Sequence, residues 1–234
     1  MDKQEIKTGP AAGVKIIPAV LEADHLKVRE ALQDFVSIAT TIQVDVCDGV
    51  FVESLTWMPN DHQDLSGFNI NLEFDMMVSD VEKYIDILFL YNPKKIVIHT
   101  RDMSIADYMI LYDKIKDHHH FVSVAICDTD MQKIKSAYGY YDYIQLMGIE
   151  HVGVQGQAFD MSVIEKIKEL DMFLENKSGV SNPIIIQIDG AMNPKNIKAC
   201  KDAGATSFVV GSYLKDSIKD NKLKEVYSEL KGIL

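Results

Sequence analysis

Short apolar runs rich in β-branched residues alternate with helical patterns along almost the whole chain. Runs of this length and composition predict strands, and the longer periodic segments between them predict helices. Strands that alternate with helices form a parallel sheet, because each helix carries the chain back to the edge where the next strand begins. The predicted strands span residues 14–21, 41–46, 70–77, 95–100, 121–126, 143–149, 184–190 and 207–212.

Seven helical patterns accompany these eight strands. Together they favour an α/β fold with a single (β/α)8 TIM barrel over an open sheet, since such barrels take about 250 residues and this chain has 234. In the pattern before the last strand, Asn193 and Pro194 provide an N-cap and a first helical residue, and Gly204 stands where a left-handed C-terminal cap is wanted. The predicted helices span 24–39, 79–91, 104–118, 129–137, 160–175, 193–203 and 216–233.

Composition and charge narrow the classes of partner. Hydrophobic residues make up 47% of the chain, and no linker-like stretch divides them, so we expect one barrel domain over 14–234 behind a flexible N-terminal tail over 1–13. The net charge of −11 argues against nucleic acid or an anionic membrane as the main partner. It leaves room for a small phosphorylated ligand, because local amide groups can hold a phosphate despite the global charge.

The chain carries no sign of export or of membrane insertion. No apolar run reaches the roughly 20 residues that a membrane helix needs, and residues 1–13 lack the apolar stretch of a signal peptide. Three cysteines, Cys47, Cys127 and Cys200, are far apart and odd in number, which predicts reduced thiols rather than a disulfide framework. Reduced thiols indicate a cytoplasmic location.

Carboxylates stand at the end of the second strand, in the stretch "IQVDVCDGVF" over 42–51. Asp45 shares one strand face with Gln43 and Cys47, because side chains alternate with a period of two. In TIM barrels the chemistry sits at the C-terminal ends of the strands. We therefore expect Asp45 to face the barrel mouth as a functional group, and the alternative is a carboxylate that caps a turn at the strand end.

The strand ends taken in order resemble the ribulose-phosphate 3-epimerase family over nearly the whole chain. The most specific matches are "VD" followed by "DGVFV" after the second strand, "GVQGQ" after the sixth, "DGAMNP" after the seventh and "GS" after the eighth. The resemblance implies a barrel of the ribulose-phosphate-binding type. It also implies an isomerase that interconverts ribulose 5-phosphate and xylulose 5-phosphate, or a close ketose phosphate.

The resemblance also implies site residues. Two aspartates on opposite sides of the sugar act in the family as base and acid, and they match Asp45 and Asp189. Carboxylates suit this work when burial or neighbours tune their pKa towards neutrality. Phosphate would be held by backbone amides in three glycine-containing loops, with Ala19 in place of a family serine beside them. The matching loop residues are Gly153, Val154, Gln155, Gly156, Gly190, Ala191, Gly211 and Ser212.

The chain departs from the family where the family binds a cation. Two family histidines are replaced by Gln43 and Asp75, so that Gln43, Asp45, Asp75 and Asp189 carry −3 in total. Either a divalent cation binds there, or repulsion keeps at least one carboxylate protonated. Oxygen ligands from these four residues would favour Mn²⁺ or Mg²⁺ over Zn²⁺. No organic cofactor is implied, and His99, at the end of the fourth strand, is expected to pack against or support the mouth.

Three functional hypotheses remain open. The first is the epimerase, with a phosphorylated ketose as its partner. The second is a phosphosugar-binding protein of the same fold that has kept the phosphate loops and lost the chemistry, and the third is a barrel enzyme adapted to another phosphorylated substrate. Asp45 and Asp189 favour the first hypothesis, whereas Gln43, Asp75 and Ala19 favour the others. The sequence also leaves open whether the chain forms a homo-oligomer.

Overall fold

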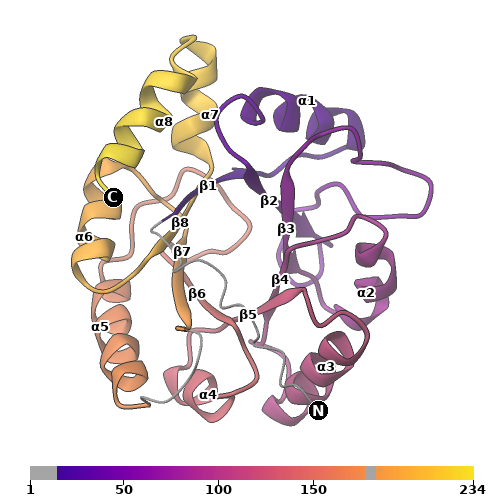
Figure 1. Cartoon of the computed structure of the whole chain (residues 1–234), viewed down its shortest axis with the longest axis vertical. Coiled ribbons are helices and arrows are strands. Elements are labelled where there is room, and N and C mark those ends of the chain that lie inside the picture. Colours follow the sequence, from indigo (N-terminus) through magenta and orange to yellow (C-terminus); the bar gives the residue numbers. More distant parts are fainter. Residues whose placement is uncertain (1–14, 178–182) are drawn as a thin grey trace, which may run out of the picture.

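Eight parallel strands close into a barrel in the computed structural model, which describes residues 15–177 and 183–234 (Figure 1). The strands follow one another around the barrel in sequence order, and β1 closes it by pairing with β8 as well as with β2. The predicted (β/α)8 TIM barrel is therefore confirmed. The strands are β1 Lys15–Val20, β2 Thr41–Cys47, β3 Asn71–Met77, β4 Lys95–His99, β5 Ser123–Cys127, β6 Tyr143–Met147, β7 Ile185–Asp189 and β8 Ser207–Val210.

Helices surround the barrel, and one predicted helix is divided in two. The pattern over 216–233 predicts one helix, but the structure has α7 ending at Lys219 and α8 beginning at Leu223. Between them Asn221 adopts a left-handed φ of 54°, which asparagine tolerates and a helix does not. The helices are α1 His25–Phe35, α2 Glu82–Phe89, α3 Ile105–His118, α4 Met131–Ser136, α5 Ser162–Glu175, α6 Pro194–Asp202, α7 Ser212–Lys219 and α8 Leu223–Gly232.

The ends of α6 match the predicted signals. The Asn193 side chain accepts a hydrogen bond from the backbone N–H of Asn196, and Pro194 is the first helical residue. Beyond the other end Gly204 has a φ of 118°, in the region that glycine enters most easily. Both predicted ends of this helix are therefore confirmed, and they set the direction in which the chain enters β8.

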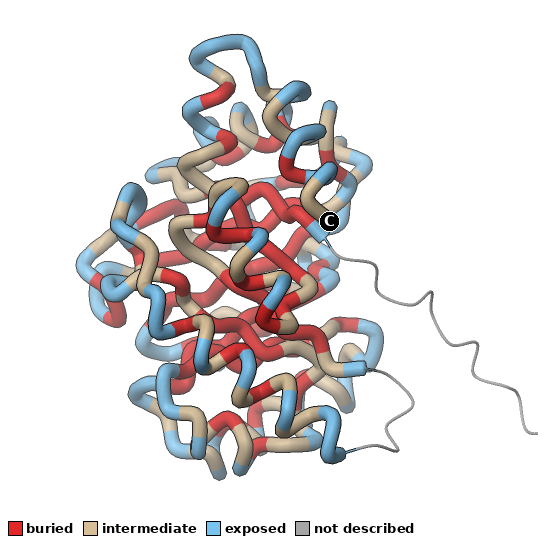
Figure 2. Tube along the Cα trace, turned by 90° about the vertical axis from the view of Figure 1, so that its left-hand side faces the viewer, coloured by how far each residue is buried: buried red, intermediate tan, exposed pale blue. Residues whose placement is uncertain are grey.

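Strand side chains divide the core into two layers. In β2, Val44 and Val46 point outwards and pack against the helices, while Gln43, Asp45 and Cys47 point into the barrel. The strands are consequently buried on both faces, and the exposed surface belongs to the helices and loops (Figure 2). The barrel interior is polar near the N-terminal ends of the strands, where the buried residues include Gln43, Glu73, Lys95, Gln145, Gln187 and Ser207.

The cysteines and the helices bear on two further expectations. Cys47, Cys127 and Cys200 are all free and buried, which confirms that they form no disulfide. Within the residues that the structure describes, none of the helices is both long enough and apolar enough to span a bilayer. The predicted N-terminal tail, residues 1–13, lies outside the described residues.

Candidate active site

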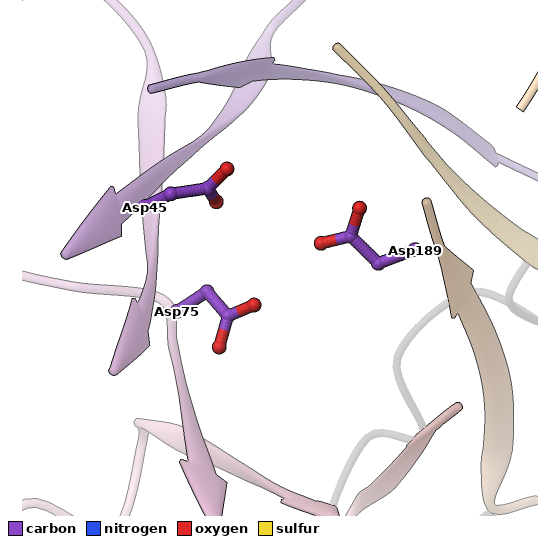
Figure 3. Close-up of side chains that lie close together, drawn as sticks. All are labelled: Asp45, Asp75 and Asp189. Atoms are coloured by element: carbon purple, nitrogen blue, oxygen red, sulfur yellow. The ribbon is translucent and has the colours of Figure 1, made fainter. Parts of the chain in front are cut away.

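Three aspartates converge at the C-terminal mouth of the barrel (Figure 3). Asp45 on β2 and Asp75 on β3 are neighbours in strand register, and Asp189 extends from β7 towards them across the mouth. One oxygen of each carboxylate lies within 4.8 Å of the others. The fold thus brings together the two aspartates expected as base and acid and the third carboxylate expected beside them.

Asp48 lies close to this cluster in sequence but has a separate structural role. Its Oδ1 accepts hydrogen bonds from the backbone N–H groups of Val50 and Phe51, each at 2.8 Å. Its Oδ2 accepts from the backbone N–H of Ser79 at 2.7 Å and from the Ser79 hydroxyl at 2.8 Å. Burial acts to raise the pKa of Asp48, but these bonds outweigh it and lower the pKa to about 2. Asp48 therefore anchors the loop after β2 as an ionised carboxylate.

Gln43 bridges the two expected catalytic carboxylates. Its Nε2 donates to Oδ1 of Asp45 at 2.9 Å and to Oδ2 of Asp189 at 2.8 Å. The sequence led us to expect the amide oxygen of Gln43 to face the cluster as a metal ligand, and the structure differs. The nitrogen faces the carboxylates, because ionised carboxylates only accept hydrogen bonds.

Asp75 is held by two nitrogen donors of its own. Nε2 of His99 lies 2.6 Å from Oδ1 of Asp75, and Nε2 of Gln145 donates to Oδ2 at 2.9 Å. Burial acts to lower the pKa of His99, but its neighbours Cys127 and Asp75 outweigh burial and raise the pKa well above the usual range. Burial also raises the pKa of the Cys127 thiol, so the Asp75 carboxylate is the charged partner of the imidazolium.

The other two aspartates hold protons more tightly than ordinary carboxyl groups. Burial first, and then the charge of Asp75, raises the pKa of Asp189 to about 7. Burial, followed by the charges of Asp189 and Asp75, raises the pKa of Asp45 well above its usual value. The raised pKa values favour a proton on this pair near neutral pH. That proton, together with the raised pKa of His99, acts against the repulsion among the three carboxylates.

The hydrogen bonds at the cluster do not fit a tightly held cation. Among the described residues, the hydroxyl of Tyr141 is buried without a hydrogen-bond partner, and Oε2 of Glu73 has only its ion pair with Lys95; neither atom belongs to the three-aspartate cluster. Burial and the charge of Asp45 also raise the pKa of Cys47 to about 12, so it offers a thiol rather than a thiolate. Both oxygens of Asp75, Oδ1 of Asp45 and Oδ2 of Asp189 already face nitrogen donors, so a cation bound to these oxygens would have to displace them.

One cavity joins Asp45 and Asp189 to the three loops expected to hold phosphate. Its apolar wall includes Met77 and Met147, which lie on inward-facing positions of β3 and β6. The fold thus gathers every residue expected to contact the substrate around one opening. Of those residues the cavity is lined by Ala19, Asp45, Gly153, Val154, Gln155, Gly156, Asp189, Gly190, Ala191, Gly211 and Ser212.

The loops around the cavity depend on close backbone approach. Gly153 has a φ of 83°, and a Cβ there would lie 2.8 Å from the Val52 side chain. Gly190 has a φ of 102°, and a Cβ there would lie 2.8 Å from Ile149. Ala191 is left-handed as well, with a φ of 56°, a conformation that costs a residue with a Cβ. Ser212 is the first residue of α7, so the eighth-strand loop leads directly into a helix N-terminus.

Comparison of the sequence with known proteins shows which family the chain resembles. A family model described as "Ribulose-phosphate 3 epimerase family" matches residues 15–215. A ribulose-phosphate 3-epimerase from Chlamydia trachomatis serovar D is 28% identical over 225 residues, which cover 94% of each chain. Another from Bacillus subtilis is 25% identical over 229 residues, which cover 94% of this chain and 99% of that protein.

A solved structure supports the fold. The 3-keto-L-gulonate-6-phosphate decarboxylase from Vibrio cholerae superposes with a TM-score of 0.66 at 14% identity, covering 94% of this chain and 97% of that one. At this level of identity the likeness concerns the barrel alone.

Proposed function

Because the chain belongs to the ribulose-phosphate 3-epimerase family, we propose that it interconverts ribulose 5-phosphate and xylulose 5-phosphate, or a close ketose phosphate. The observation that carries this proposal is the meeting of Asp45 and Asp189 in a cavity that also contains the three glycine-containing loops. Acid–base groups at one end and backbone amides at the other suit a sugar with a phosphate at its far end.

The proposed reaction moves one proton off carbon 3 and returns one on the opposite face. An ionised carboxylate takes the proton, the C–H electron pair forms a double bond between carbons 2 and 3, and the carbonyl oxygen becomes an enediolate oxygen. The second carboxyl group then gives its proton to carbon 3 from the other side, so no atom or electron is gained or lost. This exchange needs one ionised and one protonated carboxyl group, which is the state that the raised pKa values of Asp45 and Asp189 favour at neutral pH.

In the same proposal the phosphate lies against backbone amides. The first loop consists of Gly153, Val154, Gln155 and Gly156, the second of Gly190 and Ala191, and the third of Gly211 and Ser212. Because Ser212 begins α7, which has eight residues, its N-terminus adds a favourable dipole for an anion. Ala19 lies beside this third loop and supplies an apolar contact.

Any divalent cation at the cluster would be held weakly in this proposal. Asp45, Asp75 and Asp189 supply oxygen ligands, so Mn²⁺ or Mg²⁺ would be favoured over Zn²⁺. At Asp75, and at one oxygen each of Asp45 and Asp189, such an ion would compete with the side-chain nitrogens of His99, Gln145 and Gln43. The proton exchange needs no organic cofactor, and the three reduced thiols agree with a cytoplasmic reaction.

Incubation with ribulose 5-phosphate in D₂O tests the proposal. We expect deuterium to enter carbon 3, followed by NMR, together with the appearance of xylulose 5-phosphate in a coupled assay. A phosphosugar-binding protein that has lost the chemistry would bind the same ligand in calorimetry without exchanging this proton. Binding without exchange, with or without added Mn²⁺, would therefore replace the isomerase with that second hypothesis.

A further inference from the structure

Three fully buried glutamines are joined by hydrogen bonds inside the barrel, one layer below the aspartates. Gln43 lies on β2, Gln145 on β6 and Gln187 on β7. Nε2 of Gln187 donates to Oε1 of Gln145 at 2.7 Å and to Oε1 of Gln43 at 3.3 Å. We call these three residues the glutamine relay. Its central member, Gln187, touches neither the expected base nor the expected acid.

The lower end of the glutamine relay fixes how Gln187 is turned. Its Oε1 accepts from Nζ of Lys95 at 2.6 Å and from the hydroxyl of Ser207 at 2.8 Å. A lysine ammonium can only donate, so the amide oxygen of Gln187 has to face it. Lys95 is itself held by Glu73, whose Oε2 lies 2.6 Å from Nζ. The amide nitrogen of Gln187 is therefore obliged to point the other way, towards Gln43 and Gln145.

This orientation passes along the relay to the carboxylates. Because the nitrogen of Gln187 donates to the oxygens of Gln43 and Gln145, those two amides must turn their nitrogens outwards. The nitrogen of Gln43 consequently lies between Asp45 and Asp189, and the nitrogen of Gln145 lies on Asp75. A terminal amide is nearly symmetrical in shape, so the chain of donors from Lys95 decides which end faces the site.

We propose that Gln187 is a positioning residue that keeps the Gln43 amide nitrogen between Asp45 and Asp189, and that proton exchange at this site therefore runs without a divalent cation. The second half of this inference rests on the isomerase proposed above, whereas the first half does not. A cation that bridged Oδ1 of Asp45 and Oδ2 of Asp189 would lie about 2.1 Å from both oxygens, in the space that the Gln43 nitrogen occupies at 2.9 and 2.8 Å. Admitting it would require Gln43 to turn and to leave its hydrogen bond from Gln187.

The substitution Gln187→Glu tests this by reversing the relay without changing the size of the side chain. One carboxylate oxygen can keep accepting from Lys95 and Ser207, but the other can no longer donate to Gln43 or Gln145. The amides of Gln43 and Gln145 can then form hydrogen bonds to the new carboxylate only by turning their nitrogens towards it, which turns their oxygens towards the aspartates. Oxygens facing carboxylates favour a cation, so the variant is expected to acquire one.

The measurement is Mn²⁺ binding to chelator-treated protein by calorimetry and by electron paramagnetic resonance. We expect Gln187→Glu to bind Mn²⁺ at least about tenfold more tightly than the parent chain, a difference of about 1.4 kcal/mol. Gln132→Glu, at an exposed position on α4, makes the same change in charge and should leave Mn²⁺ binding unchanged. Equal Mn²⁺ affinity in the parent chain and a folded Gln187→Glu variant would overturn the positioning role.

A second test measures proton exchange in the variant, and proton exchange and Mn²⁺ binding in the parent chain. In the parent chain, removal of metal should change the rate of deuterium entry into ribulose 5-phosphate by less than about twofold. In metal-free Gln187→Glu this rate should be at least about tenfold lower than in the parent chain, and added Mn²⁺ should restore it. Tight stoichiometric Mn²⁺ binding by the parent chain, or loss of its exchange on chelation, would overturn the inference even if the variant fails to fold. If neither protein exchanges the proton under any condition, the isomerase and the cation-independent exchange fail, while the Mn²⁺ titration still decides the role of Gln187.

Discussion

Nε2 of His99 lies 2.6 Å from Oδ1 of Asp75, and both side chains are buried in the barrel mouth. His99 ends β4 and Asp75 lies on the adjacent strand, β3. Because the pKa of His99 is raised, the pair sets a positive charge against Asp75, one of three carboxylates that would otherwise repel one another. It explains how carboxylates this close together can be stable at the buried mouth of the barrel.

Removing the imidazole should destabilise the protein. His99→Leu leaves Asp75 buried without its charged partner, so we expect the free energy of unfolding to fall by about 3 kcal/mol or more. Urea denaturation at pH 6 measures this. His99→Gln, which restores a donor without a charge, should recover part of the loss. His62→Gln, at a side chain that is 88% exposed, should change stability by less than about 0.5 kcal/mol.

Asp45 and Asp189 should each be required for proton exchange at carbon 3. Asp45→Asn or Asp189→Asn removes a group that can take or give a proton but keeps its size, so we expect at least a hundredfold loss of deuterium incorporation, within the ~10²–10⁴ typical of an acid–base group. Asp61→Asn, at an exposed side chain, serves as the matched control. Exchange at the parental rate in either site variant would remove that aspartate from the mechanism.

Stability should fall as the pH rises towards neutrality, and Asp189 should cause much of the fall. The pKa of Asp189 is about 7 in the folded chain, against about 3.9 in an unfolded chain. Between these values the folded state binds a proton that the unfolded state has released, so each pH unit of increase costs up to about 1.4 kcal/mol. Urea unfolding at pH 5, 6 and 7 should show a steeper decline for the parent chain than for Asp189→Asn. Parallel pH dependences would contradict the raised pKa.

Bulk at Gly211 should impair phosphate binding selectively. A Cβ at this position would lie 3.0 Å from Nε2 of Gln155, so valine would crowd the third loop against the first. We expect Gly211→Val to weaken binding of ribulose 5-phosphate by about tenfold or more, about 1.4 kcal/mol, and to affect ribulose much less. Gly232→Val, where an added Cβ meets nothing within 4 Å, is the control. Equal losses for both sugars would mean that these loops do not hold the phosphate.

Glycine at position 191 should stabilise the chain. The left-handed φ of Ala191 costs about 1–2 kcal/mol for a residue with a Cβ, and the extra freedom of glycine in the unfolded state offsets about 0.4–1 kcal/mol of the gain. Ala191→Gly is therefore expected to raise the free energy of unfolding by about 0.5–1 kcal/mol in urea denaturation. Ala199→Gly, inside α6, should instead lower it by about 1 kcal/mol. A loss of stability in both variants would show that the loop at 191 gains nothing from glycine.

Strand positions followed from the sequence, because buried parallel strands leave a strong compositional pattern. The expected site residues also gather at one end of the barrel, where the chemistry of such barrels sits. The break at Asn221 did not follow, since the pattern of apolar residues continues across it into α8. A single left-handed residue ends a helix without altering the spacing of its neighbours.

The partners within the site were harder to predict than its members. Asp75 pairs in register with Val97, so His99 lies one step further along the same inward face, and that relation requires the register of β3 against β4. The orientation of Gln43 depends on Gln187, which reaches it from the other side of the barrel. Neither relation is local in the chain, and only the folded arrangement brings these donors and acceptors together.

The three loops around the cavity offer backbone N–H groups, which every residue except proline possesses whatever its side chain. Asp45 and Asp189 at the other end would work through side chains that a single codon change can replace. Mutation therefore acts unevenly on the two ends of this cavity during evolution. If the loops hold phosphate as proposed, anion recognition can persist through sequence divergence while the acid–base side chains are exchanged, so that such a barrel can acquire a new reaction without first losing its ligand.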